Sequence, residues 1–161
     1  MRPIDPQLVD EVWADIAEYP PDRVQGEGQS FLARQPHVAT FAGALMRGFE
    51  PTVQTAGLGL CFLLFKVFER SLGRPFPLLS EERIHTAYEA NVERLAATET
   101  GSRSLLDSFE HDGHRSLIAH ILTCFYAGER PDTYYDDDVK ANLFLLLKTL
   151  TEALDSSAIE R

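Results

Sequence analysis

The stretch from Pro51 to Gly73 constrains the fold of this chain more than any other. Pro51 suits the first position of a helix and Gly73 the position just after its end. The apolar side chains between them would go most of the way round such a helix: Leu58, Leu60, Cys61, Phe62, Leu63, Leu64, Phe65, Val67 and Phe68. A helix that is apolar on nearly all sides is normally buried on all sides. The sequence therefore predicts a central apolar helix over about 51–72, with other helices packed around it.

Two other interpretations of this stretch have less support. A membrane-spanning helix needs about 20 predominantly apolar residues, and the uninterrupted apolar run lasts only from Ala56 to Phe65. A phosphate-binding loop would need a strand before Gly57 and Gly59 and a helix opening after them, but both glycines lie inside the helical pattern. Glycines inside a helix usually allow a neighbouring backbone to approach closely. We therefore expect a buried core helix with two points of close contact.

Composition limits the classes of protein to which the chain can belong. Its 161 residues match one domain, and 44% hydrophobic residues exclude general disorder. A net charge of −10 disfavours binding to nucleic acid or to a membrane surface. Cys61 and Cys124 lie in apolar helical runs, which favours reduced, buried thiols over a disulfide framework. The first 13 residues lack the apolar stretch of a signal peptide, so the expected location is the cytoplasm.

The rest of the chain also shows helical spacing of its apolar residues. Helices are expected from Pro6 to just before Pro20-Pro21, over 37–47, from the N-cap Ser80 to Gly101, over about 115–126 and over about 137–154. Residues 22–28 are expected to form a polar loop, 29–34 a short helical turn, and 155–161 a frayed tail. No stretch alternates with a period of two over the length of a strand. The predicted fold is therefore all-α: a compact bundle of six to seven helices in a single domain over 1–161.

Histidines and carboxylates give the best candidates for a metal site. Glu110, His111 and His114 lie close together in the sequence, and His120 follows on the next predicted helix. His114 and His120 do not share a helix face, so a polar, solvent-exposed turn explains the first three residues better than a local metal site. Glu82 and His85 have the spacing of a di-iron helix motif, which needs a second such pair and two further glutamates. This chain has no second Glu-x-x-His pair.

Nucleophilic and cofactor chemistry have little support in the sequence. The chain has no Gly-x-Ser-x-Gly elbow, and its two cysteines lie where burial makes a thiol inert. Asp136-Asp137-Asp138 lacks the spacing of a calcium loop and suits the start of a helix instead. No motif calls for a cofactor, so the chain is expected not to be an enzyme. Asn91 lies on an apolar helix face, where a buried amide needs polar partners.

Three functional hypotheses follow. The first is a non-enzymatic protein that binds other proteins and forms a homodimer. The last predicted helix has apolar residues on more than one face, and a second copy could cover the excess. Phe144 and Leu145 would then form the interface. The second is a metal-binding protein that uses His and Glu side chains from different helices, drawn from the candidates named above. The third is a protein that binds a small apolar ligand in the bundle core, near Gly57, Gly59 and Asn91.

Overall fold

The structure is a computed structural model that describes residues 4–97, 115–127 and 136–159. These parts contain no strand and form seven helices: α1 (Pro6–Ala17), α2 (Pro21–Arg34), α3 (Pro36–Leu45), α4 (Pro51–Leu72), α5 (Glu81–Ala97), α7 (Arg115–Ala127) and α8 (Asp137–Ile159). The prediction of an all-α bundle that includes a central apolar helix is confirmed.

Local sequence signals define most of the helix ends. Four helices in a row have proline at their first position, where the missing N–H would have no partner within the helix. Side-chain oxygens of Asp5, Ser80 and Asp136 accept backbone N–H bonds at the starts of α1, α5 and α8. Gly73 ends α4 in the left-handed region at φ 71°, and the next N–H donates back to the carbonyl of Glu69.

Two expectations about local structure were wrong. Residues 22–28, expected as a loop, belong to α2, which starts at Pro21 and continues through Gly26 and Gly28. Tertiary packing offsets the cost of the two glycines, because α2 buries Phe31 against the ring of Phe65 on α4. The tail expected to fray continues α8 as far as Ile159. There the guanidinium of Arg83 on α5 donates to the hydroxyl of Ser156.

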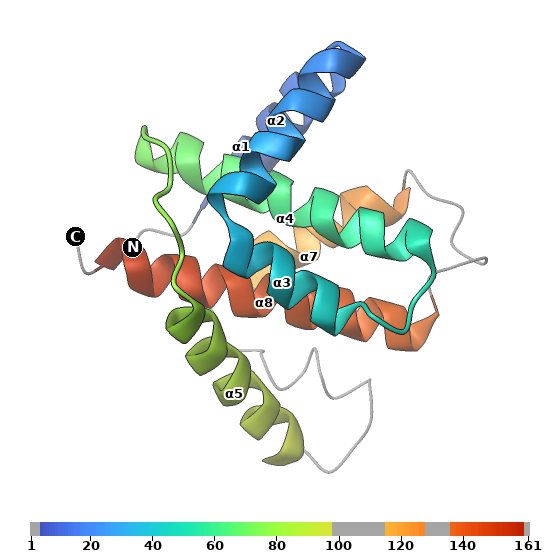
Figure 1. The fold of residues 1–161 in the computed structure, drawn as a ribbon, viewed down its shortest axis with the longest axis vertical. Coiled ribbons are helices and arrows are strands. Elements are labelled where there is room, and N and C mark those ends of the chain that lie inside the picture. Colours follow the sequence, from blue (N-terminus) through green and yellow to red (C-terminus); the bar gives the residue numbers. More distant parts are fainter. Residues whose placement is uncertain (1–3, 98–114, 128–135, 160–161) are drawn as a thin grey trace.

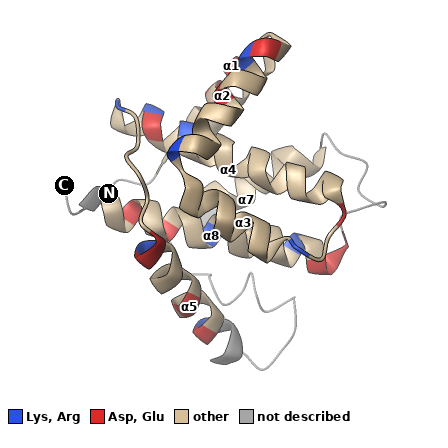
Figure 2. Ribbon diagram, in the orientation of Figure 1, with Lys and Arg blue, Asp and Glu red and all other residues tan. Residues whose placement is uncertain are grey.

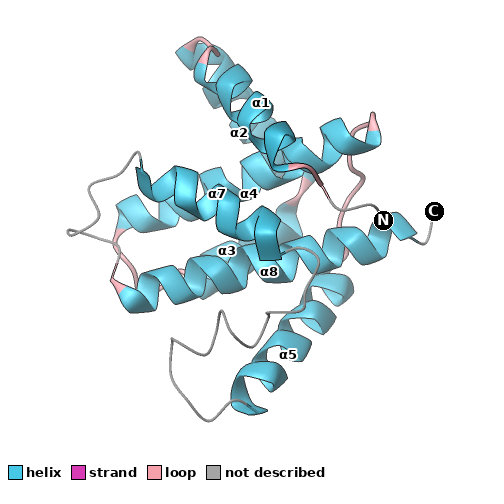
Figure 3. Cartoon of the chain, turned by 180° about the vertical axis from the view of Figure 1, so that it is seen from behind, coloured by secondary structure: helices cyan, strands magenta, loops and turns pink. Residues whose placement is uncertain are grey.

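Helices α4 and α8 lie next to each other, and each of the other five helices packs against at least one of them (Figure 1). Helix α4 packs against α1, α2 and α3, whereas α8 packs against α3, α5 and α7. In Figure 1, α1 and α2 extend away from one side of this pair, and α5 extends away from the other. Figure 3 gives the opposite view, in which α7 lies in front of α4 and α8.

The two central helices differ in how completely they are enclosed. Every side chain from Leu143 to Thr151 in α8 is buried. Helix α4 was expected to be covered on all sides, but Thr55 and Gly59 are exposed, and Leu58 and Phe62 are only partly buried. The difference arises because α1, α2 and α7 approach this face of α4 without closing over it.

Length and composition alone would allow α4 to cross a membrane. It is the one helix among the described residues that passes this test, with a mean hydropathy of 1.4, and half of its apolar window is buried inside the molecule. The core helix of a soluble protein passes the same test. Figure 2 shows that charged residues are absent from the first part of α4 and appear toward its C-terminal end.

Gly57 was expected to allow a neighbouring backbone to approach closely, but its neighbours are side chains. A Cβ atom added at Gly57 would lie 3.5 Å from the side chain of Met46 and 3.6 Å from that of Leu146. These are ordinary van der Waals distances, so Gly57 lies where the end of α3 meets α4 and α8, with little room for a side chain longer than a methyl group. Gly59 has no such neighbour, because an added Cβ would meet nothing within 4 Å.

Candidate functional site

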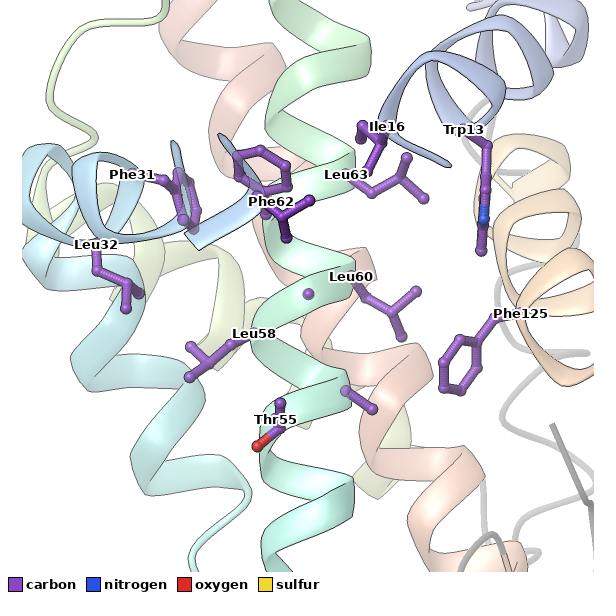
Figure 4. A pocket seen from close by; sticks show the side chains of 14 residues that line it. Trp13, Ile16, Phe31, Leu32, Thr55, Leu58, Leu60, Phe62, Leu63 and Phe125 are labelled. Carbon is purple, nitrogen blue, oxygen red and sulfur yellow. The ribbon is translucent and has the colours of Figure 1, made fainter. Parts of the chain in front are cut away.

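An apolar groove of about 470 Å³ lies on the incompletely covered face of α4 (Figure 4). Residues from α1, α2, α4 and α7 line it: Trp13, Ile16, Val24, Gly28, Phe31, Leu32, Thr55, Ala56, Leu58, Gly59, Leu60, Phe62, Leu63 and Phe125. Figure 4 shows Trp13 and Phe125 on one side of α4 and Phe31 and Leu32 on the other. The groove therefore depends on four helices that are separated along the chain.

One face of α4 forms the floor of the groove. Thr55, Gly59 and Phe62 are spaced by four and three residues, so they lie on one face of the helix. The open space above Gly59 adds depth to the groove at its middle. Both glycines were expected to allow close approach of a neighbouring backbone; Gly57 instead contacts side chains at ordinary distance, and Gly59 opens onto the groove.

The lining has almost no polar chemistry. Its described residues include no aspartate, glutamate, lysine or arginine, and their side-chain polar groups are the Thr55 hydroxyl and the Trp13 indole N–H. Val24 and Leu32 are 44% and 36% exposed, which makes them two of the four large hydrophobic side chains that are most exposed among the described residues. Such a surface gains free energy whenever an apolar partner displaces water from it.

A charged group of side chains lies next to one end of the groove. The ammonium of Lys66 on α4 lies 2.8 Å from a carboxylate oxygen of Glu27 on α2, and the other oxygen of Glu27 lies 2.7 Å from Nε of Arg23. The hydrogen bond from Lys66 lowers the pKa of Glu27 below its ordinary value. These three residues satisfy one another, and they join α2 to α4 on the side where Phe31 and Phe62 pack edge to face.

The three metal candidates that lie in the described part of the chain, Glu82, His85 and His120, do not come together as one site. Glu110, His111 and His114 lie outside the described residues. Glu82 and His85 lie on α5, where the His85 ring contacts the Glu89 carboxylate at 2.9 Å in an exposed pair. Glu82 and His85 are both exposed, in agreement with the favoured interpretation of a capping segment with an exposed face, and His85 pairs with the glutamate one turn further along α5.

His120 does lie in a cluster of potential ligands. Its Nε2 is 2.8 Å from Oδ1 of Asp10 on α1 and 3.7 Å from Sγ of Cys124, and Sγ is 4.0 Å from the same Oδ1. Asp10 and Cys124 were not among the ligands predicted from the sequence. The spacing of His120 and Cys124 by four residues was the available signal; the contact of α1 with α7 could not be seen in the sequence.

The two cysteines have different environments. Cys61 is fully buried in α4, and burial raises its pKa to about 12, as expected for an inert core thiol. Cys124 is only partly buried, so the expectation of a buried thiol was wrong for it. Partial burial, and then the negative charge of Asp10, raise the pKa of the Cys124 thiol.

The cluster does not have the geometry of a nucleophilic triad. In a triad the nucleophile and the carboxylate contact opposite nitrogens of the histidine ring. Here Asp10 and Cys124 both face Nε2 of His120. In this arrangement, His120 cannot accept the thiol proton at one ring nitrogen while Asp10 orients the ring through the other nitrogen.

Three other predicted residues lie inside the molecule. Phe144 and Leu145 are 3% and 8% exposed, so other parts of this chain cover the two apolar side chains of α8 that were expected at an interface. The buried amide of Asn91 donates to the Thr149 hydroxyl and to the Glu152 carboxylate on α8 at 3.4 and 3.5 Å. Neither Gly57 nor Asn91 lines the groove; of the three residues expected near an apolar ligand, Gly59 alone does.

Comparisons with models of protein families, with curated proteins and with solved structures found no match for this chain.

Proposed function

We propose that this protein is a non-enzymatic binder of a small, neutral, apolar molecule, which occupies the groove on α4. The observation that carries the proposal is the chemistry of the lining, which is apolar and aromatic apart from one hydroxyl and one indole N–H. Its volume of about 470 Å³ falls within the range of known small-molecule sites.

The absence of charge from the lining supports a neutral ligand. A charged group that left water for this groove would find no opposite charge among the described lining residues, and an unpaired buried charge is costly. Thr55 can orient one polar atom of the ligand. A rigid aromatic or alicyclic molecule fits best, because it loses little conformational freedom on binding.

The size of the groove favours a small ligand over a second copy of the chain. A stable protein interface usually includes about 20–30 residues on each side, whereas 14 of the described residues line this groove. The homodimer through Phe144 and Leu145 remains a prediction, but the exposed apolar surface that motivated it is absent from α8.

Fluorescence offers a direct test, because Trp13 is the only tryptophan of the chain and lines the groove. The neutral probe N-phenyl-1-naphthylamine should quench Trp13 by energy transfer and increase its own emission. We expect one site per chain with a dissociation constant on the order of 10 µM, the range for an apolar ligand of this size.

Two glycines provide a matched pair of variants. Gly59→Leu places a side chain in the groove and should weaken binding by about tenfold or more, equivalent to roughly 1.4 kcal/mol. Gly43→Leu adds the same side chain to an exposed position of α3 with open space around it, so the affinity should not change. Equal affinity for the probe in both variants, or no saturable binding to the natural chain, would contradict the proposal.

A further inference from the structure

Three different metal-ligating atoms converge at the contact between α1 and α7. Oδ1 of Asp10, Nε2 of His120 and Sγ of Cys124 all lie within 4.8 Å of one another. His120 and Cys124 are one turn apart on α7, so the same helix face presents both, and α1 brings Asp10 opposite them. This cluster is separate from the apolar groove, whose lining includes none of the three.

The distances between these atoms are close to those of a tetrahedral zinc site. Zinc bonds of about 2.3 Å to sulfur and about 2.0–2.2 Å to nitrogen and oxygen place tetrahedral ligands roughly 3.4–3.6 Å apart. Here the nitrogen and sulfur are 3.7 Å apart, and the oxygen and sulfur are 4.0 Å apart. The nitrogen and oxygen, at 2.8 Å, form a hydrogen bond that would have to open by about 0.6 Å.

The arrangement explains why both partners face the same histidine nitrogen. A hydrogen-bond relay would use both nitrogens of His120, but a metal ion needs several donor atoms directed at one point. Asp10 is 60% exposed and the histidine 30%, so an ion can reach the site and water can complete its coordination.

The donor set defines the class of ion. A thiolate and an imidazole favour a borderline-soft divalent ion, whereas calcium and magnesium prefer oxygen ligands alone. We infer that Asp10, His120 and Cys124 form a binding site for a divalent ion of the zinc class, with three protein ligands and one position open to solvent. On binding, a metal–sulfur bond replaces the S–H bond of Cys124, and its proton leaves to solvent.

Such an ion would tie α1 to α7. Both helices contribute to the wall of the groove through Trp13 and Phe125, which are close in sequence to Asp10 and Cys124. An ion that binds only the folded chain raises its stability by mass action. The bound metal should therefore raise the thermal unfolding temperature of the whole chain.

Cobalt(II) is the probe that tests the site, because its absorption reports on its ligands. Titration of the reduced, metal-free full chain should saturate at one ion and give a sulfur-to-cobalt charge-transfer band with visible bands of four-coordinate intensity. Cys124→Ser should abolish the charge-transfer band, and His120→Ala should weaken cobalt binding at least tenfold. Added zinc should displace the cobalt.

Control variants separate this site from other histidines and thiols. His85→Ala removes an exposed histidine of α5 and should leave the titration unchanged, as should Glu11→Gln beside Asp10 on α1. Cys124→Ser keeps the buried Cys61, so a charge-transfer band that persists in this variant would overturn the inference. Binding without thiolate bands, loss of binding in His85→Ala, or no binding at all would also overturn it. Gly59→Leu should still bind cobalt, which keeps this test independent of the groove.

Discussion

At the scale of single residues, two glycines of one helix have opposite roles. Gly57 packs against Met46 and Leu146, and Gly59 opens onto the groove. Gly59→Ala should raise the free energy of unfolding by about 1 kcal/mol, because alanine favours the helix and nothing obstructs its Cβ. Gly57→Leu should lower it by about 1–3 kcal/mol, because its side chain overpacks the junction of three helices.

Urea denaturation followed by circular dichroism measures both changes. Gly59→Leu is the matched control for Gly57→Leu, since it adds the same atoms two positions away on the same helix. Equal free energies of unfolding for the two leucine variants would show that Gly57 does not have the contacts described.

The sequence could not distinguish these two glycines. Both interrupt the same apolar pattern, and their roles depend on side chains from other helices, such as Met46 and Leu146. The same limit applies to Cys124. Its apolar neighbours predicted burial, but the structure leaves it partly exposed beside His120 and Asp10, the latter 114 residues earlier in the chain.

At the scale of elements, the sequence was most reliable where a helix carries its own end signals. The aspartates at 136–138 were predicted to suit the start of this helix, with Asp136 or Asp137 as its cap, and Oδ1 of Asp136 accepts the N–H of Val139 at 2.9 Å. Asp136→Ala should lower the free energy of unfolding by about 1 kcal/mol, because it leaves an N–H without a side-chain acceptor. Asp138→Ala removes an exposed carboxylate from the same turn and should cost only a few tenths of a kcal/mol. Thermal unfolding measures the loss of stability in both variants. An equal loss of stability in the two variants would argue against the cap by Asp136.

The ion pair that joins α2 to α4 should make stability depend on pH. The hydrogen bond from Lys66 lowers the pKa of Glu27 below 4.5 in the folded chain. A lowered folded pKa contributes stability above the unfolded value, and this contribution is lost as the pH falls through the folded value. Glu27→Gln should therefore lower the free energy of unfolding at neutral pH by less than about 1 kcal/mol, since the pair is partly exposed.

Denaturation of both proteins across a pH series checks this prediction. The difference between the natural chain and Glu27→Gln should shrink as the pH falls below 4.5, where protonation makes the two side chains alike. A difference that persists at low pH would show that the ion pair does not cause it.

Helix α2 shows where local signals fail. Its glycines and polar residues predicted a loop over 22–28, yet the segment is helical. Packing of Phe31 against α4 and the ion pair of Glu27 with Lys66 stabilise it, and both involve residues more than 30 positions away. Tertiary contacts thus override a weak local propensity.

At the scale of the whole molecule, helical periodicity was enough to predict the fold class and α4 as a central helix. It was not enough to predict which central helix is fully enclosed. Helix α8 is buried all round between Leu143 and Thr151, whereas α4 keeps one open face. The groove follows from how α1, α2 and α7 are placed around α4, which depends on contacts between distant segments.

The most direct test of the central claim locates the bound probe on the molecule. Nuclear Overhauser effects between N-phenyl-1-naphthylamine and methyl-labelled protein report which side chains the probe touches. We predict contacts with Leu58, Leu60 and Leu63 in the groove and none with Leu78, which is 56% exposed outside it. Contacts with Leu78 comparable to those with the groove, or broad contacts without saturation, would contradict the account.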